Sequence, residues 1–243
     1  AAAVIIYSDG GGGHPAIPHL KELDEVLKKG VGLGCIHYAV EVPKGDPGDH
    51  LLRWIGGYFE TFWSINPHWK AQFTEIPQHA TTKGVKPFST HDEWYYHMRF
   101  NEGNKGVTPI LSSVPPENTR QGKDGTHSGN EHVRKRTGQP EHVVWVYERP
   151  EGGRGFGCTG GHNHWNWGQD DFRKCILNSI LWVANVEVPE GGVKSTRPTI
   201  DGLIENQDEP VPANFKKEAK QKEVDAMNAP FTPAAPAPAP EKK

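Results

Sequence analysis

The chain has 243 residues, of which 35% are hydrophobic, and its formal net charge is −3. This length and this share of apolar residues suit one globular domain with an apolar core. The chain has no long basic block and no run near the roughly 18 apolar residues of a membrane span, which excludes nucleic acid as a partner and a membrane-spanning helix. It shows no signal peptide, so a cytoplasmic and an exported location both stay open.

Residues 1–37 predict a strand, a helix and a second strand. Ala3–Tyr7 is a continuous apolar run, which is typical of a strand buried on both faces of a parallel sheet. A glycine-rich loop follows at residues 8–15, and the next segment places apolar residues at helical spacing up to a stop at Gly30. Val31–His37 is a second apolar run. We therefore expect a right-handed βαβ unit here.

The remainder of the chain predicts further strands and helices up to about residue 190, where the composition changes. We expect a helix that breaks at Gly56–Gly57, a strand at 70–76, a strand and then a loop within 87–100, a strand at 106–114, a hairpin of 142–149 with 153–160, and a helix at 170–186. We place one α/β domain at residues 1–190. Residues 191–243 are charged and then rich in alanine and proline, so we expect a tail or stiff linker that buries no core.

Polar side chains follow four of the predicted strands, at the carboxyl ends where open α/β sheets bind their ligands. Four separate strand ends that each carry histidine or a carboxylate would meet on one rim of the sheet, which indicates a functional site more strongly than any single motif. In chain order, the candidates on this rim are Asp9, His14, His37, Tyr38, Asp92, Glu93, His162, His164 and Trp165.

Three of these candidates, His37, Glu93 and His162, have the side chains for a metal centre or for acid–base catalysis. Two neutral imidazoles and one carboxylate suit a divalent metal, zinc first, with an open position for a further ligand. Without a metal, the same groups could exchange protons with a sugar-like or acyl substrate. We assign the other six candidates to substrate binding.

The sequence leaves structural alternatives open for several candidates. His14 could cap its turn, His37 could be a hydrogen-bonded core histidine, and His164 could face away from the site. Trp165 could form an apolar platform for a sugar ring or pack the last helix against the sheet. The glycine loop lacks the Lys-Ser/Thr pair of a phosphate-binding loop, so we expect no nucleotide cofactor.

Several ordered segments resemble the ThuA-like family, named for trehalose utilisation, over about residues 1–190. The most specific are "DEWYY", the block from "GGRGF" to "GGH" and the closing helix "FRKCILNSILW". The resemblance implies a flavodoxin-like, class I glutamine amidotransferase-like fold, which is a three-layer α/β sandwich with a mainly parallel sheet. Family members usually begin with an additional strand and helix, so we expect an exposed sheet edge that a homodimer could cover.

Active members of that fold carry a cysteine nucleophile on the sharp turn after a strand. Here His37 occupies the turn and Cys35 lies two residues earlier, inside the predicted strand, so a cysteine-dependent amidotransferase is not expected. All three cysteines, Cys35, Cys158 and Cys175, lie in apolar contexts that predict buried free thiols. The resemblance therefore predicts the fold, whereas the function has to be inferred from the residues of the site.

The resemblance implies a role in the catabolism of trehalose, other disaccharides or 3-keto sugars, with a divalent metal near the elbow histidine and the Asp-Glu and Gly-Gly-His motifs. One alternative is a non-catalytic carbohydrate-binding or assembly module. Another is a metal-dependent hydrolase of esterase or lactonase type. A serine hydrolase is not expected, because the sequence contains no Gly-x-Ser-x-Gly elbow.

Overall fold

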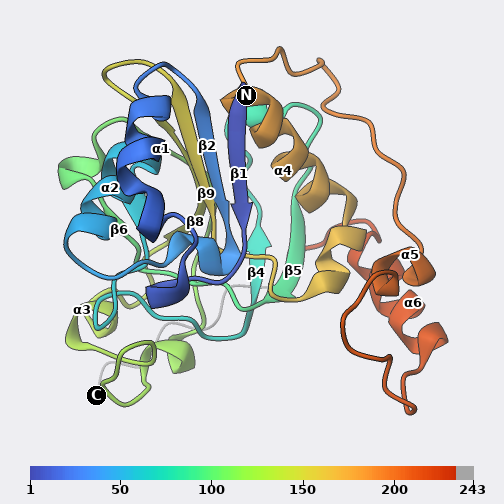
Figure 1. Ribbon diagram of the computed structural model, residues 1–243. Helices are drawn as coiled ribbons and strands as arrows, with labels where there is room; N and C mark the ends of the chain where they lie inside the picture. Colours follow the sequence, from blue (N-terminus) through green and yellow to red (C-terminus); the bar gives the residue numbers. More distant parts are fainter. Residues whose placement is uncertain (234–243) are drawn as a thin grey trace.

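A five-stranded sheet forms the centre of the computed structural model, which describes residues 1–233 (Figure 1). The first three strands pair in parallel, whereas β8 is antiparallel to both of its neighbours. Four of the five strands therefore point the same way, which confirms the expected mainly parallel α/β sheet. In spatial order, the strands are β1 (Ala3–Tyr7), β2 (Gly32–Ile36), β9 (Arg154–Cys158), β8 (Glu141–Glu148) and β7 (Val107–Ser113).

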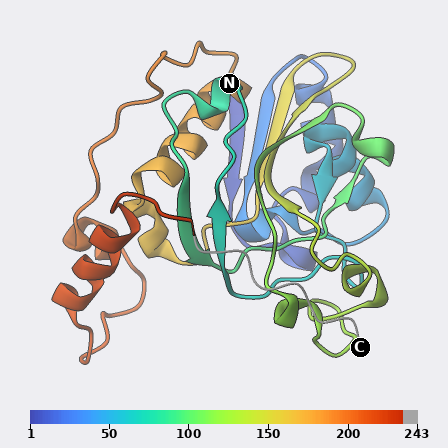
Figure 2. The ribbon, with the colours of Figure 1, turned by 180° about the vertical axis from the view of Figure 1, so that it is seen from behind.

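Helices cover both faces of the sheet, which gives three layers (Figures 1 and 2). On one face, α1 (Leu20–Leu27) and α2 (Asp46–Ile55) share an apolar cluster with Leu33 and Cys35 of β2. On the other face, α4 (Asp170–Val183) packs against residues of β8 and β9 in a second cluster. The helix α2 ends at Ile55, because Gly56 adopts a left-handed conformation with φ of +80°, so the expected break is confirmed.

The first strand is less buried than its composition predicts. Ile5 and Tyr7 of β1 are 37% and 48% exposed, so the expected burial on both faces is wrong for this strand. The physical reason is position: within residues 1–233, β1 pairs with β2 alone and forms an edge of the sheet. By contrast, every residue of β2 is buried, as its apolar run predicts.

Short elements complete the domain around the main sheet. The strands β4 (Trp69–Phe73) and β5 (Phe88–Asp92) form an antiparallel pair. All three cysteines are buried free thiols, as expected. Among the described residues, no helix combines the length and apolar character that crossing a bilayer requires. The remaining elements are β3 (Gly57–Tyr58), β6 (Arg99–Phe100), α3 (Glu131–Arg134) and the 3-10 helices η1 (Gly11–Gly13), η2 (Ile17–His19), η3 (His37–Val40), η4 (Ala80–Thr82), η5 (Glu102–Asn104), η6 (Glu117–Arg120) and η7 (His164–Gly168).

Part of the C-terminal segment folds against the domain, which corrects the expectation that residues 191–243 bury no core. The helices α5 (Ile200–Ile204) and α6 (Lys217–Met227) bury Ile200, Leu203 and Val224 in a small cluster beside η7. The composition of the segment is polar on average, but its few apolar residues gather on tryptophans of the domain. Residues 234–243, which hold most of the Ala-Pro repeat, lie outside the described residues. The boundary near residue 190 stays an interpretation.

Truncating Val224 tests this docking. We expect Val224→Ala to weaken the attachment of the C-terminal segment by about 1–2 kcal/mol, because two buried carbons are lost from a small cluster. Limited proteolysis should then cut residues 191–233 faster than in the original chain. Val186→Ala is the matched control, since Val186 is 49% exposed. Equal cleavage rates for both variants and the original chain would contradict the docking.

Candidate metal centre

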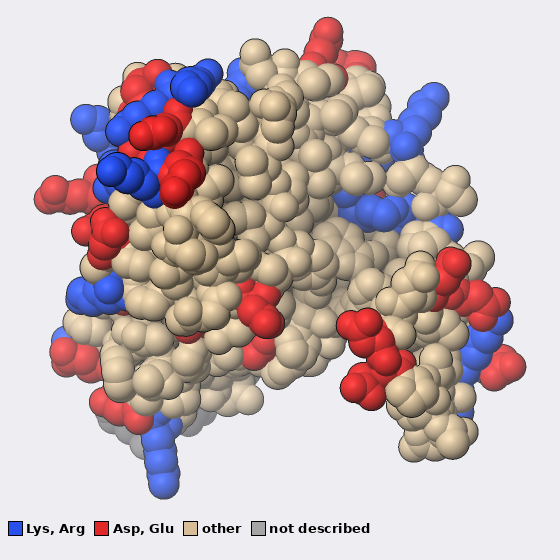
Figure 3. All heavy atoms as spheres, in the orientation of Figure 1, with Lys and Arg blue, Asp and Glu red and all other residues tan. Residues whose placement is uncertain are grey.

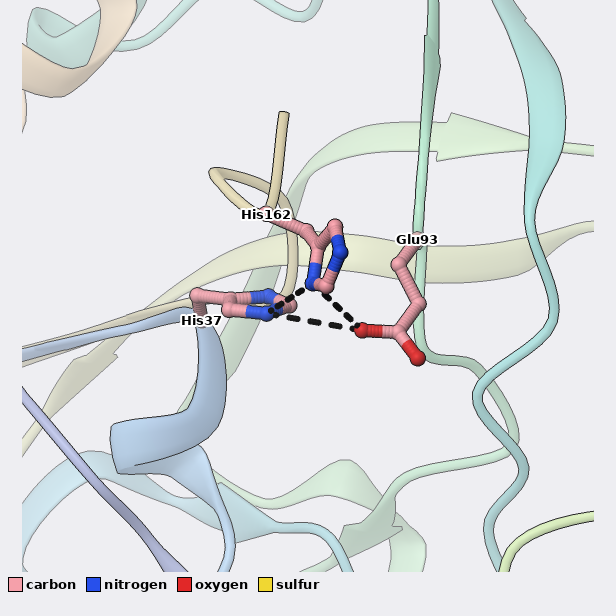
Figure 4. Close-up of side chains that lie close together, drawn as sticks. All are labelled: His37, Glu93 and His162. Atoms are coloured by element: carbon pink, nitrogen blue, oxygen red, sulfur yellow. Dashed lines mark hydrogen bonds and ion pairs between the residues drawn. The ribbon is translucent and has the colours of Figure 1, made fainter. Parts of the chain in front are cut away.

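The structure brings His37, Glu93 and His162 together at the carboxyl ends of three strands (Figure 4). His37 directly follows β2, Glu93 directly follows β5, and His162 lies in the loop after β9. His37 Nε2 lies 3.2 Å from His162 Nδ1 and 3.5 Å from Glu93 Oε2. His162 Nδ1 lies 2.9 Å from the same carboxylate oxygen. Three groups predicted from separate strand ends therefore form one cluster.

These three separations fit the face of a small coordination tetrahedron. Zinc binds nitrogen and oxygen ligands at about 2.0–2.2 Å, which places neighbouring ligands of a tetrahedral site about 3.3–3.6 Å apart. The observed triangle of 3.2, 3.5 and 2.9 Å is close to that size. One ion could contact all three atoms and keep a fourth position toward solvent, because the His162 side chain is 47% exposed. The residues therefore fit a divalent metal of the zinc type.

The backbone conformation of His37 and a hydrogen bond made by its Nδ1 fix the direction in which its Nε2 points. His37 has a φ of +56°, in the left-handed region that non-glycine residues rarely adopt, which costs about 1–3 kcal/mol. Its Nδ1 lies 3.0 Å from the carbonyl oxygen of Thr159, so the Nδ1–H donates there and the Nε2 lone pair faces the cluster. Burial lowers the pKa of His37, which favours the neutral ring that a metal requires.

Glu93 is oriented by a hydrogen bond to its second carboxylate oxygen. Asn66 Nδ2 donates to Oε1 at 3.0 Å, which leaves Oε2 for the two histidines. Tyr95 closes the other side, with its hydroxyl 3.3 Å from His37 Nε2. Burial, followed by the charge of Glu93, raises the pKa of Tyr95, so this phenol stays protonated and can donate a hydrogen bond into the centre.

Asp92 supports the centre instead of facing a substrate, which corrects its assignment to substrate binding. The side chain is fully buried. Its Oδ1 accepts hydrogen bonds from the backbone N–H groups of Glu93 and Asn163, each at 2.9 Å. Its Oδ2 accepts from the Gly161 N–H at 2.7 Å and from Asn166 Nδ2 at 2.8 Å. Four donors leave no room for a ligand, and they tie the loop of His162 to the end of β5.

His14 also has a structural role, and its capping alternative fits the geometry. The ring is 1% exposed. Its Nδ1 accepts a hydrogen bond from the Ala16 N–H at 3.1 Å, and its Nε2 donates to the Ala39 carbonyl oxygen at 3.0 Å. Both nitrogens are therefore used by the backbone, and no ring atom is free for a substrate. Tyr38 lies against the same glycine loop, where a Cβ at Gly10 would collide with the Tyr38 carbonyl oxygen.

Three further candidates lie outside the cluster. Asp9 is exposed on the loop after β1. His164 begins η7 and contacts the ring of Trp165, with their centroids 6.5 Å apart. Trp165 itself stacks on Phe215 of the C-terminal segment at 5.5 Å, and Lys220 Nζ lies 5.1 Å from its ring centroid. The packing alternative therefore describes Trp165 better than an open sugar platform.

An acid–histidine pair beside the centre escapes sequence-based reasoning. Glu41 Oε1 lies 2.9 Å from His127 Nε2, and burial raises the pKa of this 4% exposed carboxyl group. The His127 ring stacks on Phe59 at 5.2 Å, Phe59 contacts Tyr95 at 5.3 Å, and Tyr95 contacts His37 at 4.9 Å. Glu41 lies a few residues after a predicted strand, but His127 lies in a hydrophilic loop where no sequence pattern marks it as a site residue.

The cysteines cannot supply a nucleophile to this site. Cys35 is fully buried inside β2, and burial raises the pKa of its thiol to about 12. A thiol with such a pKa carries almost no thiolate at neutral pH.

Replacing Asp92 by asparagine should destabilise the protein by about 2–4 kcal/mol, because either orientation of the amide points an NH₂ group at two buried donors. Urea unfolding of the Asp92→Asn variant measures this loss. The control is Asp9→Asn, an exposed position where we expect a change within about 0.5 kcal/mol. Equal stabilities of the two variants would contradict the role given to Asp92.

The burial of His14 predicts a loss of stability in acid. Burial lowers its pKa in the folded state below the ordinary value near 6.5, so the unfolded chain takes up the proton first. The stability that the neutral His14 ring contributes is present above about pH 6.5 and is lost as the pH falls through the pKa of the folded state. Burial lowers the pKa of His97 and His142 in the same direction. Urea unfolding at pH 7.5 and 5.0 should show a smaller decline for His14→Asn than for the original chain, and equal declines would refute the assignment.

Comparison with known proteins gives the chain its family. The family model described as ThuA, trehalose utilisation, matches residues 2–183. A putative ThuA-like protein from Bacteroides uniformis ATCC 8492 has a similar structure, with a TM-score of 0.52, 19% identity, and coverage of 75% of this chain and 69% of that chain. A putative ThuA-like protein from Parabacteroides merdae ATCC 43184 gives a TM-score of 0.51, 15% identity, and coverage of 81% and 73%.

No curated protein matches this chain. The two structural likenesses concern the fold alone, since both identities are low. The family match, however, spans more than half of the chain and includes the three residues of the cluster. The chain therefore belongs to the ThuA, or trehalose utilisation, family.

Proposed function

We propose that this protein acts in carbohydrate catabolism on trehalose, a related disaccharide or its 3-keto form, at a divalent metal site formed by His37, Glu93 and His162. The observation that carries the proposal is the triangle of 3.2, 3.5 and 2.9 Å between their facing atoms. Family membership supports the carbohydrate role. The donor set of two imidazoles and one carboxylate favours zinc among the common divalent ions.

A bound divalent ion would polarise a carbonyl or hydroxyl oxygen, or lower the pKa of a water molecule. The side chains around the cluster complete this chemistry. The buried Glu41 and the half-exposed His127 form a pair that can hold or release one proton. Tyr95 can donate a hydrogen bond to an oxygen that develops negative charge. A 3-keto sugar suits such a site, because its ketone oxygen is a ligand and the adjacent C–H groups are acidic.

Metal analysis of single variants tests the proposal. We expect zinc-loaded protein to hold about one equivalent of metal, and His37→Ala and His162→Ala to lose it, because each removes one of three protein ligands. His164→Ala is the matched control, since His164 lies two residues from His162 and outside the cluster. Elemental analysis after dialysis gives the ratio of metal to protein. Stoichiometric metal in both ligand variants would refute the proposed centre.

A substrate screen then separates the classes of function. Turnover of trehalose or of its 3-keto form, lost in Glu93→Gln, supports a sugar-processing enzyme. Turnover of simple esters or lactones alone would favour a metal-dependent hydrolase of another class. Sugar binding without turnover would favour a carbohydrate-binding module.

A further inference from the structure

A cleft lies between the loop of His162 and the C-terminal segment, and it has a volume of about 390 Å³. Figure 3 shows the surface hollowed between the body of the molecule and the C-terminal helices. One wall belongs to residues 162–165, and the other to residues 203–215. The second wall lies beyond residues 2–183, the part of the chain that matches the family model. The second wall is therefore formed by the C-terminal segment and not by the part of the chain that defines the family match.

Specific contacts hold the second wall in place. Phe215 stacks on Trp165 with an angle of 20° between their planes. Arg197 Nη2 donates to Asp170 Oδ2 at 2.6 Å, which ties the start of the segment to the first turn of α4. The buried cluster of α5 and α6 adds apolar contacts beside η7. The wall is thus attached at both ends and in its centre.

His162 belongs both to the candidate metal centre and to the cleft. Its Nδ1 faces Glu93, while 47% of its side chain is exposed. It also lines the cleft. Two larger cavities, of about 730 and 580 Å³, lie where α6 meets β4 and β5, and none of the three cluster residues lines them. Of these three cavities, the smaller cleft is the one that a residue of the centre, His162, lines.

The lining suits a neutral polyol ring. Leu203, Ile204 and Val211 present apolar surface, which packs against the C–H faces of a sugar. Gln207 and Glu209 supply donors and acceptors for hydroxyl groups, and Asn163 adds its amide oxygen because its Nδ2 already donates to the His91 carbonyl oxygen. The carboxylate of Glu209 disfavours an anionic ligand. The combination of apolar faces with separate hydrogen-bonding groups fits a hexose better than a flat aromatic ring or a phosphate.

We infer that this cleft is the subsite for the second sugar ring of a disaccharide whose first ring lies at the metal centre. The inference rests on the proposed function and names the part of the substrate that the C-terminal segment recognises. It gives residues 203–215 a role in specificity, separate from the residues of the centre.

Filling the cleft tests the inference. Val211 is 44% exposed, so Val211→Trp should fold normally while its larger side chain occupies the space of a sugar ring. With the zinc-loaded full chain, isothermal titration should show trehalose bound about tenfold or more weakly, a change of about 1.4 kcal/mol. Methyl α-D-glucopyranoside, which has one ring, should bind within about twofold of the original chain because it needs only the centre.

Two further variants make the result specific. Gln207→Ala removes hydrogen-bonding groups without filling space and should weaken trehalose by about two- to tenfold. Val186→Trp places the same bulk at an exposed position outside the cleft lining and should leave both sugars unaffected. Unchanged trehalose affinity in both Val211→Trp and Gln207→Ala would overturn the inference. An equal loss in Val186→Trp would also overturn it.

Zinc content in the same samples distinguishes this failure from failure of the proposed function. If zinc is present and depends on His37, and trehalose binds every cleft variant equally, the subsite alone is refuted. If the original chain holds no zinc and binds neither sugar, the proposed function fails, and the subsite fails with it.

Discussion

The geometry of the candidate centre depends on one buried carboxylate, that of Asp92. A buried charge is costly unless hydrogen bonds replace its hydration, and here four donors do so. Three of the donors are backbone N–H groups, two of which belong to the loop that carries His162. Tyr7 adds a hydrogen bond from its hydroxyl to the Gly161 carbonyl oxygen at 2.6 Å. The loop is therefore held by the Asp92 carboxylate and the Tyr7 hydroxyl in a position where His162 meets Glu93.

The same loop explains why one histidine joins the centre and its neighbour does not. Asp92 holds the backbone on both sides of His162, at Gly161 and Asn163, which fixes the direction of the ring between them. His164 already belongs to η7, where the chain turns toward α4. On the opposite side, the strained backbone of His37 serves the same purpose, because it lifts the imidazole out of β2 and over the strand ends.

The sequence predicts which residues come together at the centre where each residue closely follows the end of a predicted strand. His37 and His162 each follow a strand whose apolar pattern can be read directly, whereas Glu93 follows β5, a strand of mixed polar and aromatic residues. Sequence-based prediction fails where the outcome depends on hydrogen bonds between distant segments. Asp92 and Glu93 are adjacent carboxylates, and only the donors from the loop of residue 161 decide which one is buried. The pairing of Glu41 with His127 spans 86 residues. The docking of residues 200–227 depends on a few apolar side chains within a polar segment.

The placement of Cys35 and His37 shows how a shared scaffold can serve different chemistry. The turn after β2 presents one side chain above the sheet, and the residues inside the strand stay buried, where the thiol of Cys35 has a pKa near 12. A histidine at this turn offers a ring nitrogen in place of a nucleophilic sulfur. With Glu93 and His162 anchored nearby, that nitrogen forms one corner of the three-residue cluster. The fold supplies the position, and the identity of the side chains at three strand ends decides what the position can bind.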